Sequence, residues 1–137
     1  MAIDIERFCE HLDLMVGPIV AEVVMNQSGS SQGKEEAASI RREKPETAIQ
    51  ELLDSFADAE TLSGVGVVKA TIPEASLGPV DIEVSNPCVK RTTGAAKSFL
   101  FSYWCGLLTQ LLGKEFKIDH VAYDRDKNLM KGRIIPR

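Results

Sequence analysis

Acid–base chemistry near neutral pH would fall to two histidines in this chain, His11 and His120. His120 alternates with Phe116 and Ile118, a period of two that is typical of a half-buried strand. A lone histidine on an inward strand face is more often a hydrogen-bonded core residue than a general base or a metal ligand. We therefore expect His120 to face inward, where it could also border a bound ligand.

The cysteines do not form a reactive or metal-binding motif. Cys9, Cys88 and Cys105 are an odd number with no CxxC spacing. Cys105 follows Trp104 in the most apolar stretch of the chain, where low dielectric raises the pKa of a thiol and makes it unreactive. The pattern predicts buried thiols in a reducing cytoplasm.

Sequence fingerprints of catalysis are also missing. The chain has no Ser-His-Asp pattern, paired carboxylate motif, P-loop or GxGxxG sequence. Only His120, Tyr103 and Tyr123 would support catalysis. The sequence therefore favours a protein that is not an enzyme and uses no cofactor, while it leaves catalysis open.

One basic segment could bind an anion. Lys90, Arg91 and Lys97 surround the predicted start of a helix, where free backbone N–H groups and the helix dipole favour negative charge. A carboxylate-headed ligand could place its head there and its tail along Phe99 and Tyr103. The alternative is a solvated loop with a threonine cap.

The helix that follows covers residues 98–113, SFLFSYWCGLLTQLLG. Its 16 residues would rise roughly 24 Å, short of the roughly 30 Å of hydrocarbon in a bilayer, so we expect a buried helix of a soluble core and no membrane span. Gly113 is well placed to end it. Five large side chains are candidates to fill the core and to line an apolar cavity: Phe99, Phe101, Tyr103, Trp104 and Leu107.

One line along this helix carries only small residues. At 100° per residue the line contains Ala95, Ser98, Ser102, Gly106, Thr109 and Gly113. Small residues on one line let another backbone approach closely. We expect a tightly packed neighbour there.

The first half of the chain predicts helices. Apolar residues spaced by three and four form a narrow stripe that resembles a helix-docking or dimer seam: Ile5, Phe8, Leu12, Met15, Ile19 and Val23. Pro18 either kinks this helix near Gly17 or starts a second one. Residues 26–33, NQSGSSQG, contain no apolar side chain and predict a flexible connector.

A charged helix is expected after this connector. Pro45 should end it and suits the first turn of a further helix. The apolar face of that further helix consists of Ile49, Leu52, Leu53 and Phe56.

From Gly64 the period changes to two. Residues 65–72 and 80–85 predict two strands joined by a turn over 73–79, and residues 116–122 and 129–135 predict two more. Two hairpins joined by a buried helix predict an α+β fold, with N-terminal helices and a four-stranded antiparallel sheet. We expect a single domain over residues 1–137, with a helical part over 1–62 and a strand-strand-helix-strand-strand core over 64–137.

The net charge of −4 is divided unevenly along the chain. Residues 1–60 carry 13 acidic and 5 basic side chains (−8), and residues 61–137 carry 7 acidic and 11 basic ones (+4), so the two halves should attract each other. The positive charges are spread over strands and turns without an aromatic platform, so we expect no nucleic-acid binding. The N-terminus is acidic from its fourth residue, which is untypical of a secretory or transit peptide.

Two segments carry a family resemblance. The segment FLFSYWCGLLTQLLGKEFKI is a leucine-rich helix that ends in Leu-Leu-Gly before a strand, and VDIEVSNPCV is a strand that ends in Asn-Pro. From Gly64 on they resemble the small-molecule-binding domain named after the four-vinyl reductase of bacteriochlorophyll synthesis. The resemblance implies a fold shared with phenol-responsive bacterial sensor domains and with tethering-complex subunits of Golgi transport. It also implies a homodimer, and an apolar cavity beside the leucine-rich helix for hydrocarbons, aromatics or acyl chains.

Zinc binding, which many members of that family use, is not implied for this chain. The family's zinc ligands correspond to Lys97, His120, Tyr123 and a residue near Lys131. One histidine cannot supply the four N or S donors of a structural zinc site. Despite the family's name, the chain shows no nicotinamide or flavin fingerprint, so we expect no metal and no reductase cofactor.

Three functions stay open at this point. The first is a dimeric carrier or sensor that binds an apolar small molecule through Phe99, Phe101, Tyr103, Trp104, Leu107, His120, Lys90 and Arg91. The second is a dimeric interaction scaffold with a filled cavity, assembled through the stripe over residues 5–23. The third is an enzyme that acts on an apolar substrate.

Overall fold

The computed structural model describes residues 4–72 and 78–137. It contains four helices and a four-stranded sheet in the order α1 (Ile5–Val16), α2 (Pro18–Glu43), α3 (Ile49–Leu62), β1 (Val67–Thr71), β2 (Val80–Ser85), α4 (Gly94–Leu112), β3 (Phe116–Asp124) and β4 (Leu129–Pro136). The strands pair antiparallel in the order β1-β2-β4-β3. The predicted α+β fold, with two hairpins joined by a buried helix, is confirmed. Most of the turn predicted over 73–79 lies outside the described residues.

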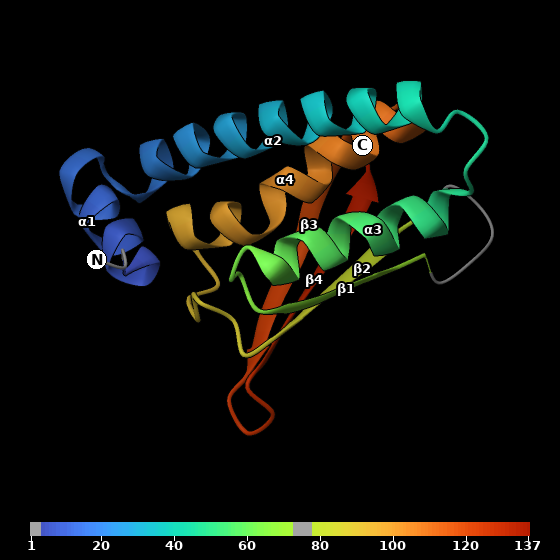
Figure 1. Cartoon of the computed structure of the whole chain (residues 1–137). Helices are drawn as coiled ribbons and strands as arrows, with labels where there is room; N and C mark the ends of the chain where they lie inside the picture. The colour runs from blue at the N-terminus through green and yellow to red at the C-terminus, as the bar shows by residue number, and fades with distance from the viewer. Residues whose placement is uncertain (1–3, 73–77) are drawn as a thin grey trace.

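The helices form layers on the sheet. α4 lies between α2 and the sheet, and α3 lies along β1 (Figure 1). The inward face of β2 is fully buried through Val80, Ile82 and Val84, as its alternating sequence predicts. On β4, Gly132 leaves room for the ring of Phe101, because a Cβ there would lie 2.5 Å from Cε1 of that ring.

The predicted connector over residues 26–33 is wrong, because these residues form the middle of α2. Their small side chains serve helix packing. A Cβ on Gly33 would strike the Tyr103 carbonyl of α4, and a Cβ on Gly106 of α4 would strike the Ser30 carbonyl of α2. The predicted close approach along the small-residue line of α4 is therefore confirmed, and the partner is the very segment that lacks apolar side chains.

Pro18 starts a second helix. Gly17 separates α1 from α2 at φ 84°, a left-handed conformation that glycine adopts readily, and Pro18 occupies the first position of α2, where its missing N–H costs nothing. Of the two alternatives at this position, the split is correct. The chain turns there, so α1 packs against both α2 and α4.

α3 begins later than predicted. Residues 45–46 form a turn, and the helix starts at Ile49 rather than at Pro45. The guanidinium of Arg41 donates to the carbonyls of Pro45 (3.3 Å) and Thr47 (2.9 Å), which holds the chain in this turn. The predicted apolar face is confirmed, since Leu52, Leu53 and Phe56 are buried and Ile49 packs against them.

His120 does not face inward. A bulge between Ile118 and His120 shifts the register of β3 on β4, so the inward phase passes from Phe116 and Ile118 to Val121 and Tyr123. The His120 side chain is 63% exposed and its Nδ1 lies 3.1 Å from the Asp119 carboxylate. The prediction of an inward, ligand-bordering His120 is wrong because strict alternation ends at this bulge.

Candidate functional site

The predicted ligand residues divide between core and surface. Phe101, Trp104 and Leu107 are fully buried and fill the space beside α4. Phe99 and Tyr103 are half-buried and line a hollow. Lys90, Arg91 and His120 line none of the hollows described below.

The N-terminus of α4 already holds an anion from the chain itself. The buried carboxylate of Asp13, on α1, accepts a hydrogen bond from Ala95 N–H (3.4 Å) and forms an ion pair with Arg91 (3.0 Å). The Lys90 backbone N–H donates to the Glu6 carboxylate at 3.1 Å. The predicted ligand carboxylate is therefore replaced at this place by Asp13, which closes α1 onto α4.

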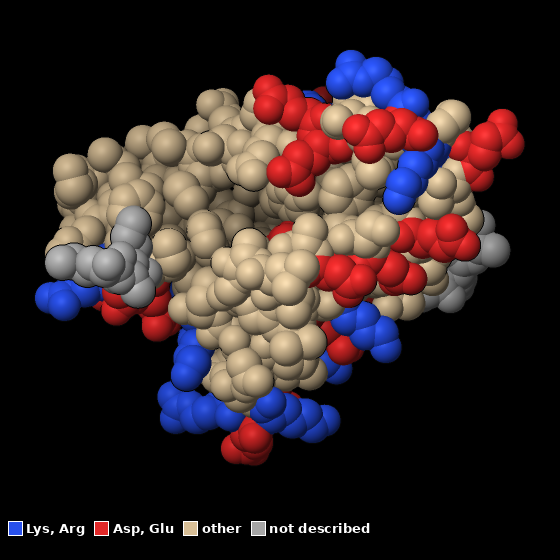
Figure 2. All heavy atoms as spheres, viewed as in Figure 1, with Lys and Arg blue, Asp and Glu red and all other residues tan. Residues whose placement is uncertain are grey.

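A first hollow of about 480 Å³ lies between α2, the end of α3 and α4. Figure 2 shows it near the centre of this face, with acidic side chains on one side of it. We call it the acidic hollow; it is lined by Met25, Ser28, Gly29, Gln32, Glu36, Ala59, Glu60, Ser63, Val65, Phe99, Ser102 and Tyr103. Its charged lining residues are two glutamates, with no basic side chain among them.

The two glutamates differ in their hydrogen bonding and in the pKa of the side chain that each affects or carries. The Tyr103 hydroxyl donates a short hydrogen bond to Glu36, and this contact together with burial raises the pKa of Tyr103 well above its ordinary value. Burial, reinforced by the charge of Glu36, raises the pKa of Glu60 to about 8. The Trp104 indole N–H lies close enough to oppose that rise, although it makes no hydrogen bond of standard geometry. Glu60 therefore holds its proton at neutral pH in the unliganded protein.

Aromatic rings build one wall of the acidic hollow. Tyr103 meets Trp104 edge to face at a centroid distance of 5.9 Å and meets Phe56 in the same way at 6.4 Å. Because Trp104 is fully buried, this contact fixes the ring that faces the hollow. Tyr103 is thus a rigid wall with its hydroxyl already occupied by Glu36.

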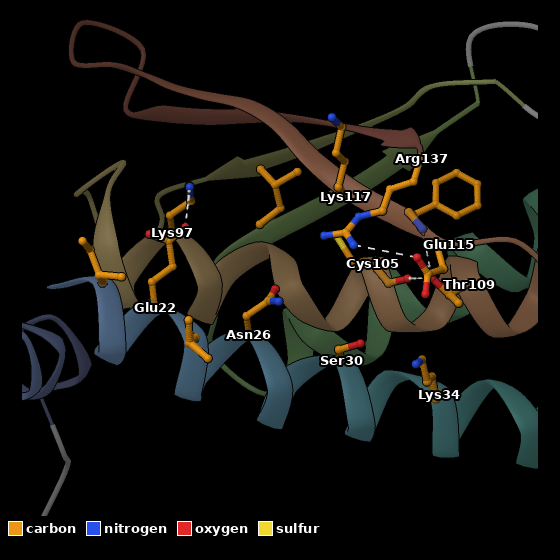
Figure 3. A pocket seen from close by; sticks show the side chains of 14 residues that line it. Glu22, Asn26, Ser30, Lys34, Lys97, Cys105, Thr109, Glu115, Lys117 and Arg137 are labelled. Atoms are coloured by element: carbon orange, nitrogen blue, oxygen red, sulfur yellow. Dashed lines mark hydrogen bonds and ion pairs between the residues drawn. The ribbon is translucent and has the colours of Figure 1, made fainter. Parts of the chain in front are cut away.

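A second hollow of about 450 Å³ lies on the other side of the contact between α2 and α4, next to β3 (Figure 3). We call it the basic hollow; it is lined by Ile19, Glu22, Val23, Asn26, Ser30, Lys34, Lys97, Cys105, Thr109, Glu115, Phe116, Lys117, Ile118 and Arg137. It holds four basic and two acidic side chains. Its net charge is therefore opposite to that of the acidic hollow.

Two of these four basic side chains form ion pairs with acidic side chains of the same hollow. Lys97 pairs with Glu22 at 2.6 Å, and Arg137 pairs with Glu115 at 3.8 Å (Figure 3). Within the described part of the chain, Lys34 and Lys117 have no ion pair. In the view of Figure 3 the Lys117 side chain extends from β3 away from Lys34 on α2, so the two ammonium groups are available to an anion separately.

Cys105 lies in the floor of the basic hollow as an unreactive thiol. Burial raises the pKa of Cys105 to about 12, so the reactive thiolate is scarce at neutral pH. The predicted burial of this cysteine is confirmed. Among residues 4–72 and 78–137, no three His, Cys, Asp or Glu side chains gather as a metal site.

A large apolar surface covers α1 and the first half of α2. We call it the apolar face; its side chains are between 43% and 83% exposed and comprise Phe8, Leu14, Met15, Val16, Ile19, Val20, Val23 and Val24. Four of the six predicted seam residues belong to it, whereas Ile5 and Leu12 pack partly against the core. This end of the molecule shows few charged side chains in Figure 2.

Four lining residues were not predicted from the sequence: Glu36, Glu60, Lys34 and Lys117. Glu60 follows Phe56 by four positions and so shares the buried face of α3, a spacing that could have identified it. Lys34 and Glu36 lie on α2 beyond the segment predicted as a connector, so no groove beside them was expected. Lys117 carries no signal in the sequence beyond its strand position.

No known family profile matches this sequence, and no curated protein resembles it closely enough to count as a relative. Among solved structures, the chain is similar to a trafficking protein particle complex subunit 3 from Naegleria fowleri, solved covalently bound to palmitic acid. The TM-score is 0.61 at 8% sequence identity, over 93% of this chain and 87% of that one. The two chains share a fold. Among the described residues, no helix has both the length and the hydropathy needed to cross a bilayer.

Proposed function

We propose that this protein is an interaction subunit that associates with a second copy of itself through the apolar face of α1 and α2. The observation that carries the proposal is that eight large apolar side chains stand exposed on two consecutive helices. Apolar patches of several hundred Å² on a monomer mark interaction sites, and a stable interface buries about 800 Å² per partner. The structural neighbour, by its name, is also a subunit of a complex.

A second copy is the occupant that this surface fits best. The exposed side chains are aliphatic apart from Phe8, so they carry no charge pattern that would select a different partner. A surface of this kind is self-complementary across a two-fold axis, where each copy offers the same patch. Lys97 also neutralises Glu22 at the edge of the face, which removes a repulsive charge from the contact.

Light scattering after size exclusion tests this assembly. The wild type should have twice the 15.0 kDa mass of one chain, and the double variant Met15→Asp/Ile19→Asp should have the mass of one, because both side chains are 79% exposed on the face. Leu62→Asp is the matched control, since Leu62 is 89% exposed at the end of α3 and lies outside the face. A monomeric wild type, or a double variant that remains dimeric, contradicts the proposal.

A second function, binding of an acyl chain as a carrier or sensor, is favoured by the basic hollow. Lys34 and Lys117 have no ion pair among residues 4–72 and 78–137, and Ile19, Val23 and Phe116 give apolar contact in the same hollow. A carboxylate could pair with one of the two lysines while its hydrocarbon tail lies on the apolar side chains. This moves the predicted carboxylate-headed ligand from the start of α4 to the other side of the helix. The neighbour's palmitic acid supports an acyl ligand.

Octanoate titration tests this second function. Lys34→Gln/Lys117→Gln should weaken octanoate binding about tenfold or more, because either lysine that could take the carboxylate is lost and one charge-assisted contact is worth about that factor. Lys127→Gln, in the exposed turn between β3 and β4, is the control of similar type and should leave the affinity unchanged. Calorimetry that finds no octanoate binding, or equal affinities for all three chains, rejects the acyl ligand.

We also propose that this chain belongs to the four-vinyl reductase domain family and that it is located in the cytoplasm. Membership in the four-vinyl reductase domain family is supported by the helix and strand motifs around α4 and β2, and a relation to tethering subunits is supported by the shared fold. Free Cys9, Cys88 and Cys105 support a reducing cytoplasm.

A further inference from the structure

The acidic hollow contains polar groups whose hydrogen-bonding capacity is not met. Oε1 of Glu60 is shielded from solvent and has no hydrogen-bond partner. The indole nitrogen of Trp104, on a fully buried ring next to that carboxyl, also lacks one. A buried polar atom without a partner costs about 1–3 kcal/mol, so such atoms in a native protein call for an explanation. A group that donates a hydrogen bond to Glu60 would remove the cost at that oxygen, whereas the Trp104 N–H is itself a donor and is not satisfied by it.

The charge of the hollow selects the kind of donor. Glu36 and Glu60 enter it from α2 and α3, and no lysine, arginine or histidine is among its described lining residues. Both oxygens of Glu36 already accept hydrogen bonds, from Gln32 at 3.4 Å and from Tyr103. A positive charge beside them would be attracted by Glu36 and would favour the ionised form of Glu60. An anionic headgroup would be repelled by the same carboxyls.

Apolar and aromatic side chains in the walls of the acidic hollow can contact the uncharged part of a ligand. Phe99 and Tyr103 present ring surfaces from α4, and Met25 and Val65 add aliphatic contact. Ring faces attract organic cations as well as apolar groups. The volume of about 480 Å³ lies within the usual range of small-molecule sites.

We infer that the acidic hollow is a binding site for a small molecule that carries a protonated amine on an apolar chain. The ammonium group lies between the carboxyls of Glu36 and Glu60, and the apolar chain lies against Phe99, Tyr103 and Met25. Glu60 gives up its proton to solvent when the ammonium group arrives. This site is separate from the apolar face and from the basic hollow, so it does not depend on the function proposed above.

Calorimetric titration with two probes of equal chain length, octylamine and octanol, tests the site. Octylamine should bind the full chain at least about tenfold more tightly than octanol, because one charge-assisted contact to a desolvated carboxyl is worth at least that factor. Glu60→Gln should remove this preference while octanol binding stays the same. Glu36→Gln, at an exposed position that preserves the fold, should weaken octylamine binding by a smaller factor.

Matched controls locate the binding. Lys117→Gln removes a charge from the basic hollow and should leave octylamine binding unchanged, and the dimer-breaking Met15→Asp/Ile19→Asp variant should bind octylamine as the wild type does. The inference is overturned if octanol binds as tightly as octylamine, if Glu60→Gln and Glu36→Gln both retain full affinity, or if octylamine does not bind. Failure of the dimer proposal would leave these results unaffected, so the two proposals are tested separately.

Discussion

The acidic hollow and the basic hollow have nearly the same size and opposite charge, at about 480 and 450 Å³ on two sides of one helix contact. Both use α2 and α4, whose backbones meet along small residues. The acidic hollow adds Glu60 from α3, and the basic hollow adds Lys117 from β3. The difference teaches that the shared helix pair supplies the shape and part of the charge of each hollow, through Glu36 on one side and Lys34 on the other, while the third element adds Glu60 or Lys117.

Neither hollow continues into the core, because large side chains of α4 fill the space beneath it. Phe101, Trp104 and Leu107 are fully buried, so the space beneath α4 is filled by side chains. A ligand of either hollow must therefore lie against α4 from the surface. This favours amphipathic ligands, whose charged end stays near solvent, over a fully enclosed hydrocarbon.

The largest effect is expected from breaking the contact that separates the hollows. Gly106→Val places branched carbon atoms against the Ser30 backbone of α2, which cannot move aside as a flexible side chain can. We expect a loss of more than about 3 kcal/mol in the free energy of unfolding, at the upper end of overpacking effects. Urea denaturation measures it, with Ser31→Val at an exposed position of α2 as the control. A loss of under about 1 kcal/mol would mean that the helices do not approach this closely.

An effect of comparable size, about 3–4 kcal/mol between pH 5 and pH 8, is expected from pH acting on one hollow alone. The folded-state pKa of Glu60, about 8, lies above its ordinary value of 4.5, so the folded chain keeps a proton that the unfolded chain has released. The contribution of this group to stability is fully present below about pH 4.5 and is lost as the pH rises toward 8. Facing groups are Glu36 on α2, Tyr103 and Trp104 on α4, and Cys88 after β2.

Glu60→Gln provides the comparison for this pH effect. The amide cannot ionise, so the variant should lose less stability than the wild type between pH 5 and pH 8 in parallel urea titrations. Lys117→Gln, in the basic hollow, should follow the wild-type curve. Parallel curves for the wild type and Glu60→Gln would show that Glu60 titrates normally and that the acidic hollow is open to water.

The sequence predicted those parts of the fold in which one pattern dominates. The alternation of apolar and polar residues in β2 predicted a strand of the sheet. The continuous apolar stretch of α4 predicted a buried helix that ends at Gly113, where the left-handed φ of 70° suits glycine. The N-terminal stripe gave most of the apolar face. In these elements the burial of large side chains decides the structure, and the sequence displays it directly.

The predictions failed where a distant contact decides the structure. Residues 26–33 resemble a linker because they lack apolar side chains. The small residues of α4 around Gly106, against which they pack, lie far along the chain. His120 points outward because a bulge adds one residue to β3 without a sequence signal. The start of α4 resembled an anion site, but Asp13 from α1 fills it. The acidic hollow could not be predicted for the same reason, because it forms only where α2, α3 and α4 meet.

The opposite charge selectivity of the two hollows is tested most directly by amide NMR spectra of the full chain titrated separately with octylamine and with octanoate. The account predicts that octylamine shifts the signals of Glu60, Phe99 and Tyr103, whereas octanoate shifts those of Lys34, Phe116 and Lys117. If both probes shift the same set of signals, or if neither shifts any of these six, the hollows do not discriminate charge and the account is wrong.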